Sequence, residues 1–441
     1  MAEPLRRTII SILPLFAGLS LLVVGHGLQN TLLPLRAFAE GIIARDVGFM
    51  MSAYYVGFVA GCVFVPRVVH GVGHIRTFAS FAALGAAIAL GYGLFVNPIF
   101  WGVLRALNGF CFAGLFMVIE SWLNERVADE ARGRMNSFYR VVDLASLTGG
   151  QALIVVAPIL SHLPFMYVAI AIALALVPMT LSATSAPSPI AAVRLPFRAL
   201  IRASPVGVVG CLAIGLSNGA FWSLGPLFAI GEGRDEGFVA AFMGLAVIGG
   251  AVAAYPIGIV SDRFDRRHVI AATLFATTAA AALLALAESY LHGALLPLVA
   301  LYGGTMLPLY SLCVAHTNDR LAAGQFVFAS RGLLLVFGVG ASLGPSIAAA
   351  LIQALGQWAL FGYTGVVFGL AGLFTVYRIL RREPAVATEP VGYAGMTGTT
   401  PSAFGSDLQG NSSAEILAPD AATPVDDAAP STGERDAMRR E

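Results

Sequence analysis

The sequence contains no lysine, so all 26 of its basic residues are arginines. Charge of either sign is scarce, since only 12% of the 441 residues are charged. A soluble domain keeps roughly a quarter of its residues charged, so this chain cannot hydrate the surface of a protein of its length. The absence of lysine also excludes a phosphate-binding loop of the form G-x-x-x-x-G-K-[ST], and with it ATP-driven pumping by this chain.

Cysteine is scarce as well. The four cysteines, Cys62, Cys111, Cys211 and Cys313, lie in apolar stretches without the paired spacing of a disulfide framework or a metal site. We expect them to be small packing residues. Because the chain also lacks an H-E-x-x-H motif, a nucleophile elbow and paired catalytic carboxylates at mid-membrane depth, we do not expect an enzyme. We expect no cofactor, metal ion or nucleic acid as a partner.

Apolar residues are abundant: they make up 57% of the chain, and the mean hydropathy is +0.80. A helix needs roughly 20 apolar residues to cross the hydrocarbon core of a bilayer. The sequence therefore predicts an all-α membrane protein with twelve transmembrane helices. The predicted spans are 9–35, 46–67, 76–97, 99–124, 136–160, 164–183, 206–230, 237–260, 268–288, 292–316, 325–354 and 357–378.

The arginines in the loops are unevenly divided between the two sides of these spans. Seventeen fall on the side that holds the N-terminus, and three, Arg36, Arg45 and Arg234, fall on the other. Basic residues are enriched in cytoplasmic loops. We therefore predict a multi-pass protein of the bacterial inner (plasma) membrane, with both termini in the cytoplasm.

Four segments differ in composition. Residues 1–183 and 205–382 each hold six of the predicted spans, and we expect each to form a six-helix bundle. Residues 184–204 are rich in proline and basic, so we predict a cytoplasmic linker. Residues 383–441 carry ten acidic residues against three arginines and few apolar residues, so we predict a disordered cytoplasmic acidic tail.

The two halves repeat one another. A displacement of 192 residues aligns them, and near the end of each half a displacement of 191 places Arg140 on Arg331. Two halves with the same handedness form a parallel repeat, which is typical of carriers whose halves rock about a site at their interface. Pro34 and Pro226 are predicted to break their helices. Aligned pairs include Gly27 with Gly219, Thr31 with Ser223, Pro34 with Pro226, Met51 with Met243, and Gly57 with Gly249.

Three motifs at matching topological positions resemble the major facilitator superfamily (MFS). Residues 258–267 read GIVSDRFDRR, similar to the superfamily's loop G-x-x-x-D-R-x-G-R-R, although Asp265 replaces the second glycine. Residues 105–109 read RALNG, similar to R-x-x-Q-G with asparagine for glutamine, and residues 338–345 resemble a glycine-rich motif that ends in G-P. Residues 120–126 resemble a little-characterised bacterial branch of the superfamily.

The resemblance covers residues 1–382 and implies the MFS fold, with two pseudo-symmetric six-helix bundles. It also implies a loop that locks the cytoplasmic side through acid–arginine pairs. In the first half, His70 stands where the acid belongs, so the resemblance shifts this role to the second half. The gate candidates there are Asp262 and Arg263.

Ionisable groups inside spans are expensive, so they should face a partner or a wet cavity. Arg105 lies about ten ångströms deep in its span, at about 1.5 Å per residue, and is expected to anchor a solute or to act as a packing hub. Glu120, Arg140 and Asp143 lie at similar depth near the cytoplasmic end. They fit a proton-coupling switch or a static gate, and Arg331, for which Asp319 or a backbone carbonyl is the expected partner, joins them as a gate candidate.

Polar residues at repeat-related positions predict a solute site between the halves. His26 of the first span aligns with Asn218 of the seventh. Aromatic walls could come from Tyr54, Tyr55, Phe221 and Trp222, or these rings could simply pack. The candidate solute-binding residues are His26, Gln29, Asn30, Arg105, Asn108, Asn218 and Trp222.

The sequence therefore predicts a secondary active transporter of a small organic solute by alternating access, coupled to protons, that works as a monomer in the lipid bilayer. The combination of amides and aromatic rings favours uptake of a polar aromatic nutrient, such as a riboflavin-like vitamin. An efflux antiporter for drugs or metabolites is an alternative. A membrane receptor or scaffold that no longer transports is an alternative of another class.

Overall fold

The computed structural model describes residues 2–126, 132–181, 197–231, 233–290, 292–321 and 326–381. The predicted acidic tail lies outside the described residues, as does most of the predicted linker. The last part of that linker is helical and forms α7, Phe197–Ala203.

The first half consists of six long helices joined by short loops, and a 3₁₀ turn, Leu153–Val156, follows the fifth. Short loops between long helices place consecutive helices antiparallel to one another. The helices are α1 Ala2–Ala39, α2 Ala44–Val72, α3 His74–Gly91, α4 Pro98–Arg126, α5 Arg132–Ala152 and α6 Leu163–Leu181.

The second half repeats this arrangement with one interruption. Its fourth crossing is divided at residues 307–308, so the predicted span 292–316 becomes two helices in line. The helices are α8 Pro205–Ile230, α9 Glu236–Arg263, α10 Arg266–Tyr290, α11 Leu295–Met306, α12 Leu309–Asn318, α13 Phe326–Leu355 and α14 Ala359–Arg381, with a 3₁₀ turn, His292–Ala294, before α11. The described residues contain no strand.

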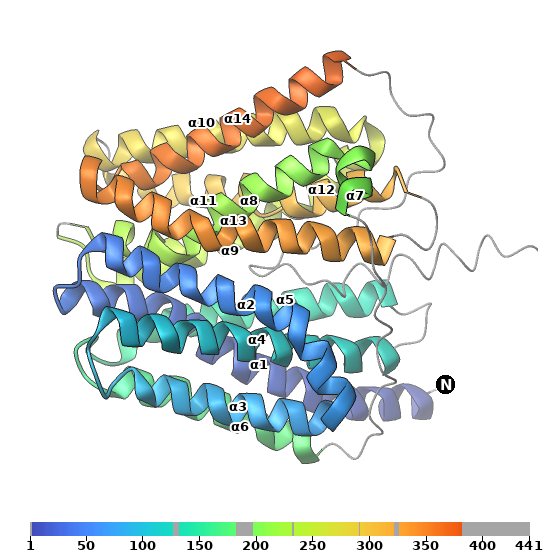
Figure 1. Ribbon diagram of the computed structural model, residues 1–441, viewed down its shortest axis with the longest axis vertical. Coiled ribbons are helices and arrows are strands. Elements are labelled where there is room, and N and C mark those ends of the chain that lie inside the picture. Colours follow the sequence, from blue (N-terminus) through green and yellow to red (C-terminus); the bar gives the residue numbers. More distant parts are fainter. Residues whose placement is uncertain are drawn as a thin grey trace, which may run out of the picture.

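Eleven segments within the described residues are long and apolar enough to cross a membrane, and α11 and α12 count as one of them. The predicted crossing that is not among them is α5. Its sequence includes Arg140 and Asp143, which lower its hydropathy, yet α5 packs along α1 and α9 within the bundle (Figure 1). With α5 included, the described residues thus form an all-α, multi-pass membrane protein with six crossings in each half.

Helix packing follows the repeat. In the first half α2 packs on α4, α1 on α5, and α3 on α6; in the second half α9 packs on α11, α8 on α13, and α10 on α14. Figure 1 shows the two sets of helices as two layers, which meet where α2 packs on α13, α5 on α9, and α1 on α8. Any site between the layers is therefore lined by helices from both.

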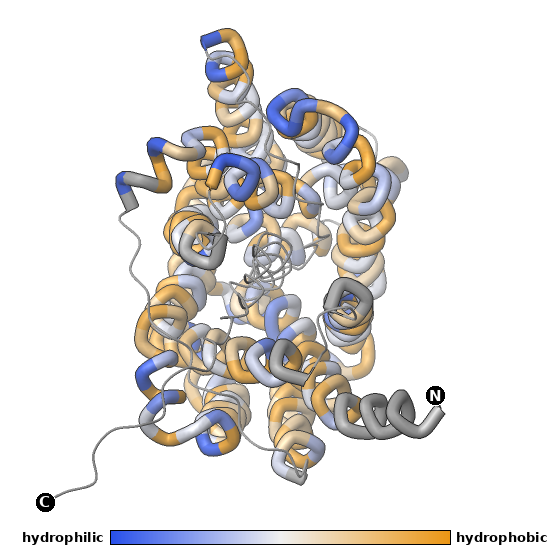
Figure 2. The backbone as a smooth tube through the Cα atoms, turned by 90° about the vertical axis from the view of Figure 1, so that its right-hand side faces the viewer, coloured by the Kyte–Doolittle hydropathy of each residue, from blue (hydrophilic) through white to orange (hydrophobic). Residues whose placement is uncertain are grey.

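The two ends of the bundle differ in charge. We call the end at which α1 begins the basic end, because Arg76, Arg266 and Arg267 lie there at the turns into α3 and α10; the other is the far end. Figure 2 looks from the basic end, where hydrophilic stretches gather at the helix ends while the helices themselves are mostly hydrophobic.

The two prolines predicted to break their helices do not do so. Pro34 lies inside α1, which continues to Ala39, and Pro226 lies inside α8, which continues to Ile230. Proline removes one backbone hydrogen bond, but a helix held by its neighbours can continue past it.

Candidate functional site

Arg105 is the centre of a polar cluster in the first half. Its side chain is 1% exposed, and its two terminal nitrogens donate to Oδ1 of Asn30 at 3.1 and 3.2 Å. The guanidinium carbon lies 4.5 Å from the centre of the Tyr54 ring, in the geometry of a cation–π contact. Helices α1, α2 and α4 thus supply one residue each.

His26 extends this cluster by one helical turn along α1. Its Nε2 lies 2.8 Å from Nδ2 of Asn30. Its ring centre lies 4.6 Å from that of Phe112 and 5.5 Å from that of Tyr54, so aromatic rings enclose it. Asn30 therefore connects the imidazole to the guanidinium of Arg105.

The positive charge of Arg105 has no anionic partner in the described part of the chain. Its polar contact is the neutral amide of Asn30, and no carboxylate lies within 4 Å of it there. A buried arginine normally pairs with a carboxylate, because an unpaired charge in a low-dielectric interior is costly. The cluster carries a net charge that a bound anion could neutralise.

Two buried amides accompany Arg105. Gln29 and Asn108 are fully buried, and none of their side-chain nitrogen and oxygen atoms has a hydrogen-bond partner. Asn108 lies three residues after Arg105 and four before Phe112, hence on the face of α4 that contacts α1. Buried polar groups are nearly always hydrogen-bonded, so these amides are available to a solute or to water.

The related positions of the second half hold a different chemistry. Asn218 replaces His26 and is buried with Oδ1 unpartnered, whereas Phe221 and Trp222 stand at the positions of Gln29 and Asn30. The Trp222 side chain is 7% exposed, and its Nε1 has no partner in the described residues. The repeat thus places polar groups on α1 and aromatic rings on α8.

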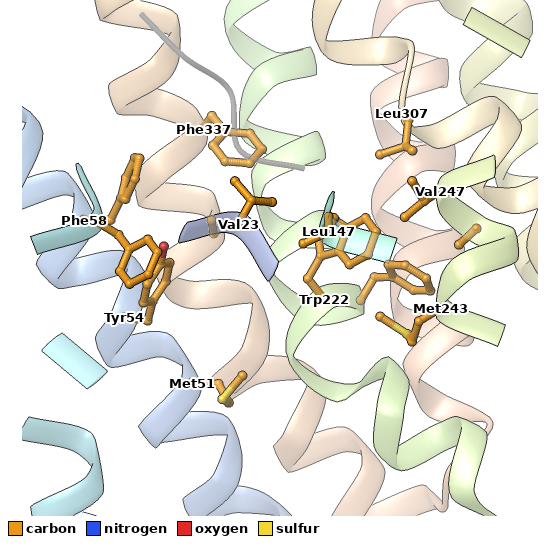
Figure 3. Close-up of a cluster of buried hydrophobic side chains, with 14 of the residues drawn as sticks. Val23, Met51, Tyr54, Phe58, Leu147, Trp222, Met243, Val247, Leu307 and Phe337 are labelled. Carbon is orange, nitrogen blue, oxygen red and sulfur yellow. The ribbon is translucent and has the colours of Figure 1, made fainter. Parts of the chain in front are cut away.

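Trp222 faces the other half. Figure 3 shows it beside Leu147 of α5, within a group of apolar side chains that also includes Met243 and Val247 of α9. Behind it, the ring centre of Phe221 lies 5.4 Å from that of Tyr302. The aromatic rings predicted as walls therefore divide into Trp222 at the interface and Phe221 in the core.

Tyr54 and Tyr55 have different roles in the structure. Tyr54 stacks under Arg105, and its buried hydroxyl has no partner. The hydroxyl of Tyr55 instead lies near Ser223 of α8, in the other half. One of the two predicted walls is thus part of the polar cluster, and the other lies between α2 and α8.

A second polar cluster lies nearer the basic end. The hydroxyl of Tyr139 donates to Oε1 of Glu120 at 3.3 Å, and the guanidinium of Arg140 lies 5.4 Å from the centre of the same ring. Tyr139 therefore connects Glu120 with Arg140. Asp143 is buried one turn away; it accepts no hydrogen bond within the part of the chain that the structure describes, and the charge of Arg140 acts on it.

One of the two gate candidates in the last turn of α9 belongs to a larger network of ion pairs. Asp262 pairs with Arg266 at 3.0 Å, and Arg266 also contacts Asp319 of α12 at 2.6 Å and donates to the hydroxyl of Ser261 at 3.2 Å. Arg266, which is buried, is therefore the centre of this network. Arg263 is exposed, and the described residues offer it no ion pair.

Asp319 was one of the partners expected for Arg331, and its contact with Arg266 shows that it has another. Arg331 is half-buried in α13. A sequence offset that relates two arginines, here Arg140 and Arg331, does not fix their partners, because the acidic residues around them do not repeat.

Asp265 forms a separate pair in the loop between α9 and α10. Its carboxylate accepts hydrogen bonds from Arg267 at 2.7 and 3.2 Å. These bonds hold the pKa of Asp265 at about 2, below its ordinary value. Aspartate in place of the second motif glycine therefore gives the loop a permanently ionised pair at neutral pH.

Two of the four cysteines are neighbours despite their distance in the sequence. Cys211 of α8 and Cys313 of α12 lie next to one another, and all four cysteines are free thiols. Sequence spacing alone could not reveal this pair, since it depends on how α8 packs on α12.

Three residues of these clusters were not candidates from the sequence: Tyr139, Phe112 and Arg266. Tyr139 and Phe112 are aromatic residues whose role depends on a neighbour, and helical spacing was the signal available: Phe112 follows Arg105 by two turns. Arg266 lies inside the loop motif but was not separated from its neighbours. Asp319 was expected beside Arg331, and no pattern indicated its contact with Arg266, because that contact joins α12 to the start of α10.

The family profile described as Major Facilitator Superfamily matches residues 15–331 and 235–404 of the chain. The "Uncharacterized MFS-type transporter YcaD" of Escherichia fergusonii is 26% identical over 341 residues, which cover 77% of this chain and 88% of that protein. The "Uncharacterized MFS-type transporter Ent638_1421" of Enterobacter sp. (strain 638) is 26% identical over 344 residues, which cover 78% and 89%.

Solved structures show the same architecture. A mutant of the nucleoside transporter NupG matches with a TM-score of 0.73 at 12% identity, covering 83% of this chain and 99% of that one. An auto-inhibited peptide transporter of the POT family matches with a TM-score of 0.67 at 11% identity, covering 86% and 98%. At these identities the likeness shows the fold alone.

Proposed function

The chain belongs to the major facilitator superfamily, and from that premise we propose that it takes up a polar aromatic solute by alternating access, coupled to protons. The membership supports transport of a small molecule. The solute class, the direction and the coupling ion are our proposal, and they are supported by the two polar clusters and by the rings on α8.

The observation that carries the proposal is the unpaired buried charge of Arg105. Placing an arginine inside a membrane span is costly, up to roughly 2.5–3.5 kcal/mol at the helix centre on insertion scales. A packing role alone would be served by a neutral residue at less cost. Arg105 is instead kept between Asn30 and Tyr54, with Gln29 and Asn108 unpartnered nearby, which suits a site that is completed by its solute.

We propose that the basic end faces the cytoplasm. The excess of arginines at that side supports this orientation. At the far end α2 and α13 are joined by a hydrogen bond between Ser52 and Ser346, so in this conformation the solute site would open to the cytoplasm.

The proton-coupling step is proposed for the second cluster. Glu120, linked through Tyr139 to Arg140, can alternate between an ionised and a protonated form, and the buried carboxyl of Asp143 can do the same. The static gate remains the alternative for this cluster. Asp262, Arg263 and Arg331 are proposed as gate residues, with the ion pair of Asp262 supporting the first of them.

The remaining features of the proposal follow from the sequence. Residues 1–183 and 205–382 would rock as two units about the interface, and the protein would act as a monomer. The matching helix pairs of the two halves support this division.

The test is solute flux into proteoliposomes, preceded by an uptake and growth screen of vitamins and drugs in cells with and without the protein. Arg105→Ala should abolish uptake while membrane insertion stays intact, because the variant removes the anchor and leaves the apolar length of α4 unchanged. Arg45→Ala, at an exposed arginine, is the control. Full flux in the Arg105 variant would contradict the anchoring role.

The same assay separates the alternatives. An efflux antiporter would not fill right-side-out vesicles with solute. It would empty preloaded vesicles as protons enter down an inward gradient. A receptor or scaffold would bind the solute without moving it. Trp222 and the buried amides support uptake of one solute class over efflux of many, since a broad exporter needs a large apolar cavity.

A further inference from the structure

We propose that the solute is an aromatic anion, held with its acidic group against Arg105 of the first half and its ring against Trp222 of the second. The inference rests on the proposed function, and it adds the charge of the solute and its orientation. Three independent features of the structure carry it: the charge of the first cluster, the asymmetry of the repeat and the unpartnered amides.

The first of these features is the positive charge of the cluster around Arg105. An arginine side chain carries a positive charge, and the contacts of Arg105 in the described residues are a neutral amide oxygen and an aromatic ring. His26, the other ionisable group of the cluster, can only add positive charge. The planar guanidinium matches a carboxylate or phosphate in a two-bond geometry, so the group that best completes this cluster is anionic.

The repeat supplies the orientation. Asn30 and Trp222 occupy equivalent positions on α1 and α8, and these helices pack on one another at the interface of the halves. Equivalent positions lie at equal depth on opposite sides of the pseudo-twofold axis. A solute between them therefore meets a polar surface on one side and an indole ring on the other, which suits a molecule with an acidic end and a flat apolar end.

The amides add hydrogen-bonding capacity. Gln29 and Asn108 together offer two amide donor groups and two acceptor oxygens, all buried and without protein partners. In the second half, Phe221 stands at the position of Gln29, and Asn218 offers one unpartnered amide oxygen, so most of this capacity lies in the first half. A solute turned the other way round would leave these groups unsatisfied and would place its charge against Trp222.

The first experiment gives Arg105 an internal anion. Asn30→Asp should convert the 3.1 Å hydrogen bond into an ion pair, and so occupy the place of the solute's acidic group. The purified protein is tested by thermal shift with probe pairs that share a ring: nicotinate with nicotinamide, and flavin mononucleotide with riboflavin. Asn97→Asp, at the residue that caps α4, is the matched control.

For the wild type and the control, at least one anion should raise the Tm and bind about tenfold or more tightly than its neutral partner, since a charged hydrogen bond contributes about 1.5–3 kcal/mol. In Asn30→Asp the Tm without a probe should rise, and the shift caused by the anion should disappear. Equal binding of the neutral partners, no shift with any anion, or an anion shift that survives in Asn30→Asp would each overturn the proposal.

The second experiment tests the ring. Benzoate and cyclohexanecarboxylate carry the same charge, and only the first is aromatic. Trp222→Leu should reduce the preference for benzoate while leaving the requirement for a carboxylate, and Trp358→Leu, at an exposed tryptophan of the far end, should leave both unchanged. A benzoate preference that is unchanged in Trp222→Leu would place the ring elsewhere.

Binding and flux distinguish this inference from the proposed function. If proteoliposomes transport a neutral aromatic solute and no anion binds, transport stands and the anionic class is wrong. If anions bind with the expected pattern but no solute of any kind crosses the membrane, the site is right and the uptake function is wrong.

Discussion

The hydroxyl oxygens of Ser52 in α2 and Ser346 in α13 lie 2.8 Å apart, and the backbone nitrogen of Ser346 also donates to Ser52 at 3.2 Å. One turn further towards the far end, a side chain on Gly48 would collide with the backbone oxygen of Pro345. The two halves are therefore in direct backbone contact at the far end. A carrier that alternates must separate this pair to open the far side.

A disulfide at this position should stop transport. With cysteine at both positions, the short separation of the two side chains allows a disulfide to form on mild oxidation. We expect the oxidised double variant Ser52→Cys, Ser346→Cys to lose flux in proteoliposomes and to regain it on reduction. The single variants are the controls. Wild-type flux in the fully cross-linked protein would show that the far side opens elsewhere.

Two glycines at repeat-related positions should be intolerant of a side chain. An added Cβ on Gly57 would collide with the backbone oxygen of Ala106, and one on Gly249 would collide with that of Ala300. Because backbone atoms cannot give way, each substitution by alanine should cost about 1–3 kcal/mol of stability.

Thermal unfolding in detergent measures this cost. Gly149→Ala is the control, because its Cβ would meet no atom within 4 Å. A Tm of Gly57→Ala equal to that of the control would mean that α2 and α4 separate easily. It would also remove the physical reason for the glycine at this position.

The helices could be predicted from the sequence because the bilayer sets their length and polarity. The repeat could be predicted as well, since Gly57 and Gly249 fulfil the same steric need in the two halves. The interruption of the tenth crossing at residues 307–308 could not, because an apolar stretch reads the same whether its helix is continuous or broken.

The sequence predicted which residues belong to the site, but it did not predict which residues they contact. Intramembrane charge and amides singled out Arg105, Asn30 and His26, and the structure brings these three together. The partner of Arg105 could have been an acidic residue for all that sequence shows. Asp262 lies four residues before Arg266, but the contact of Arg266 with Asp319 depends on the packing of α12 against α10, and no local pattern encodes it.

Arg266 should be more important to stability than its exposed neighbour Arg263. Arg266→Gln removes the cation that joins Asp262 to Asp319, and both carboxylates are partly exposed. We therefore expect a loss between the surface value of about 1 kcal/mol and the buried value of about 3 kcal/mol. Arg263→Gln should change stability by about 0.5 kcal/mol or less. Urea titration of the purified variants measures both, and equal effects would remove Arg266 from the centre of the network.

The pH dependence of transport should arise at Glu120 and not at Asp265. The pKa of Asp265 is lowered from 3.8 to about 2 by its bonds from Arg267, so the carboxylate stays ionised at every pH used for transport. A lowered pKa adds stability that is complete above about pH 4 and is lost only as the pH falls towards 2. Between pH 5 and pH 8 this pair is therefore constant, and we expect Asp265→Asn to leave the pH profile of uptake unchanged.

Glu120→Gln removes a carboxyl that can take up a proton while it keeps the acceptor oxygen for the hydroxyl of Tyr139. If this group carries the coupled proton, the variant should lose uptake driven by a pH gradient and keep exchange of solute across the membrane, because exchange needs no net proton movement. Measuring both modes on the same vesicles separates coupling from folding. If the variant keeps gradient-driven uptake, Glu120 is a static gate residue. Asp143, whose carboxyl lies one turn away from Tyr139, is then the position to test. In that case Asp143→Asn must lose gradient-driven uptake and keep exchange in the same pair of assays.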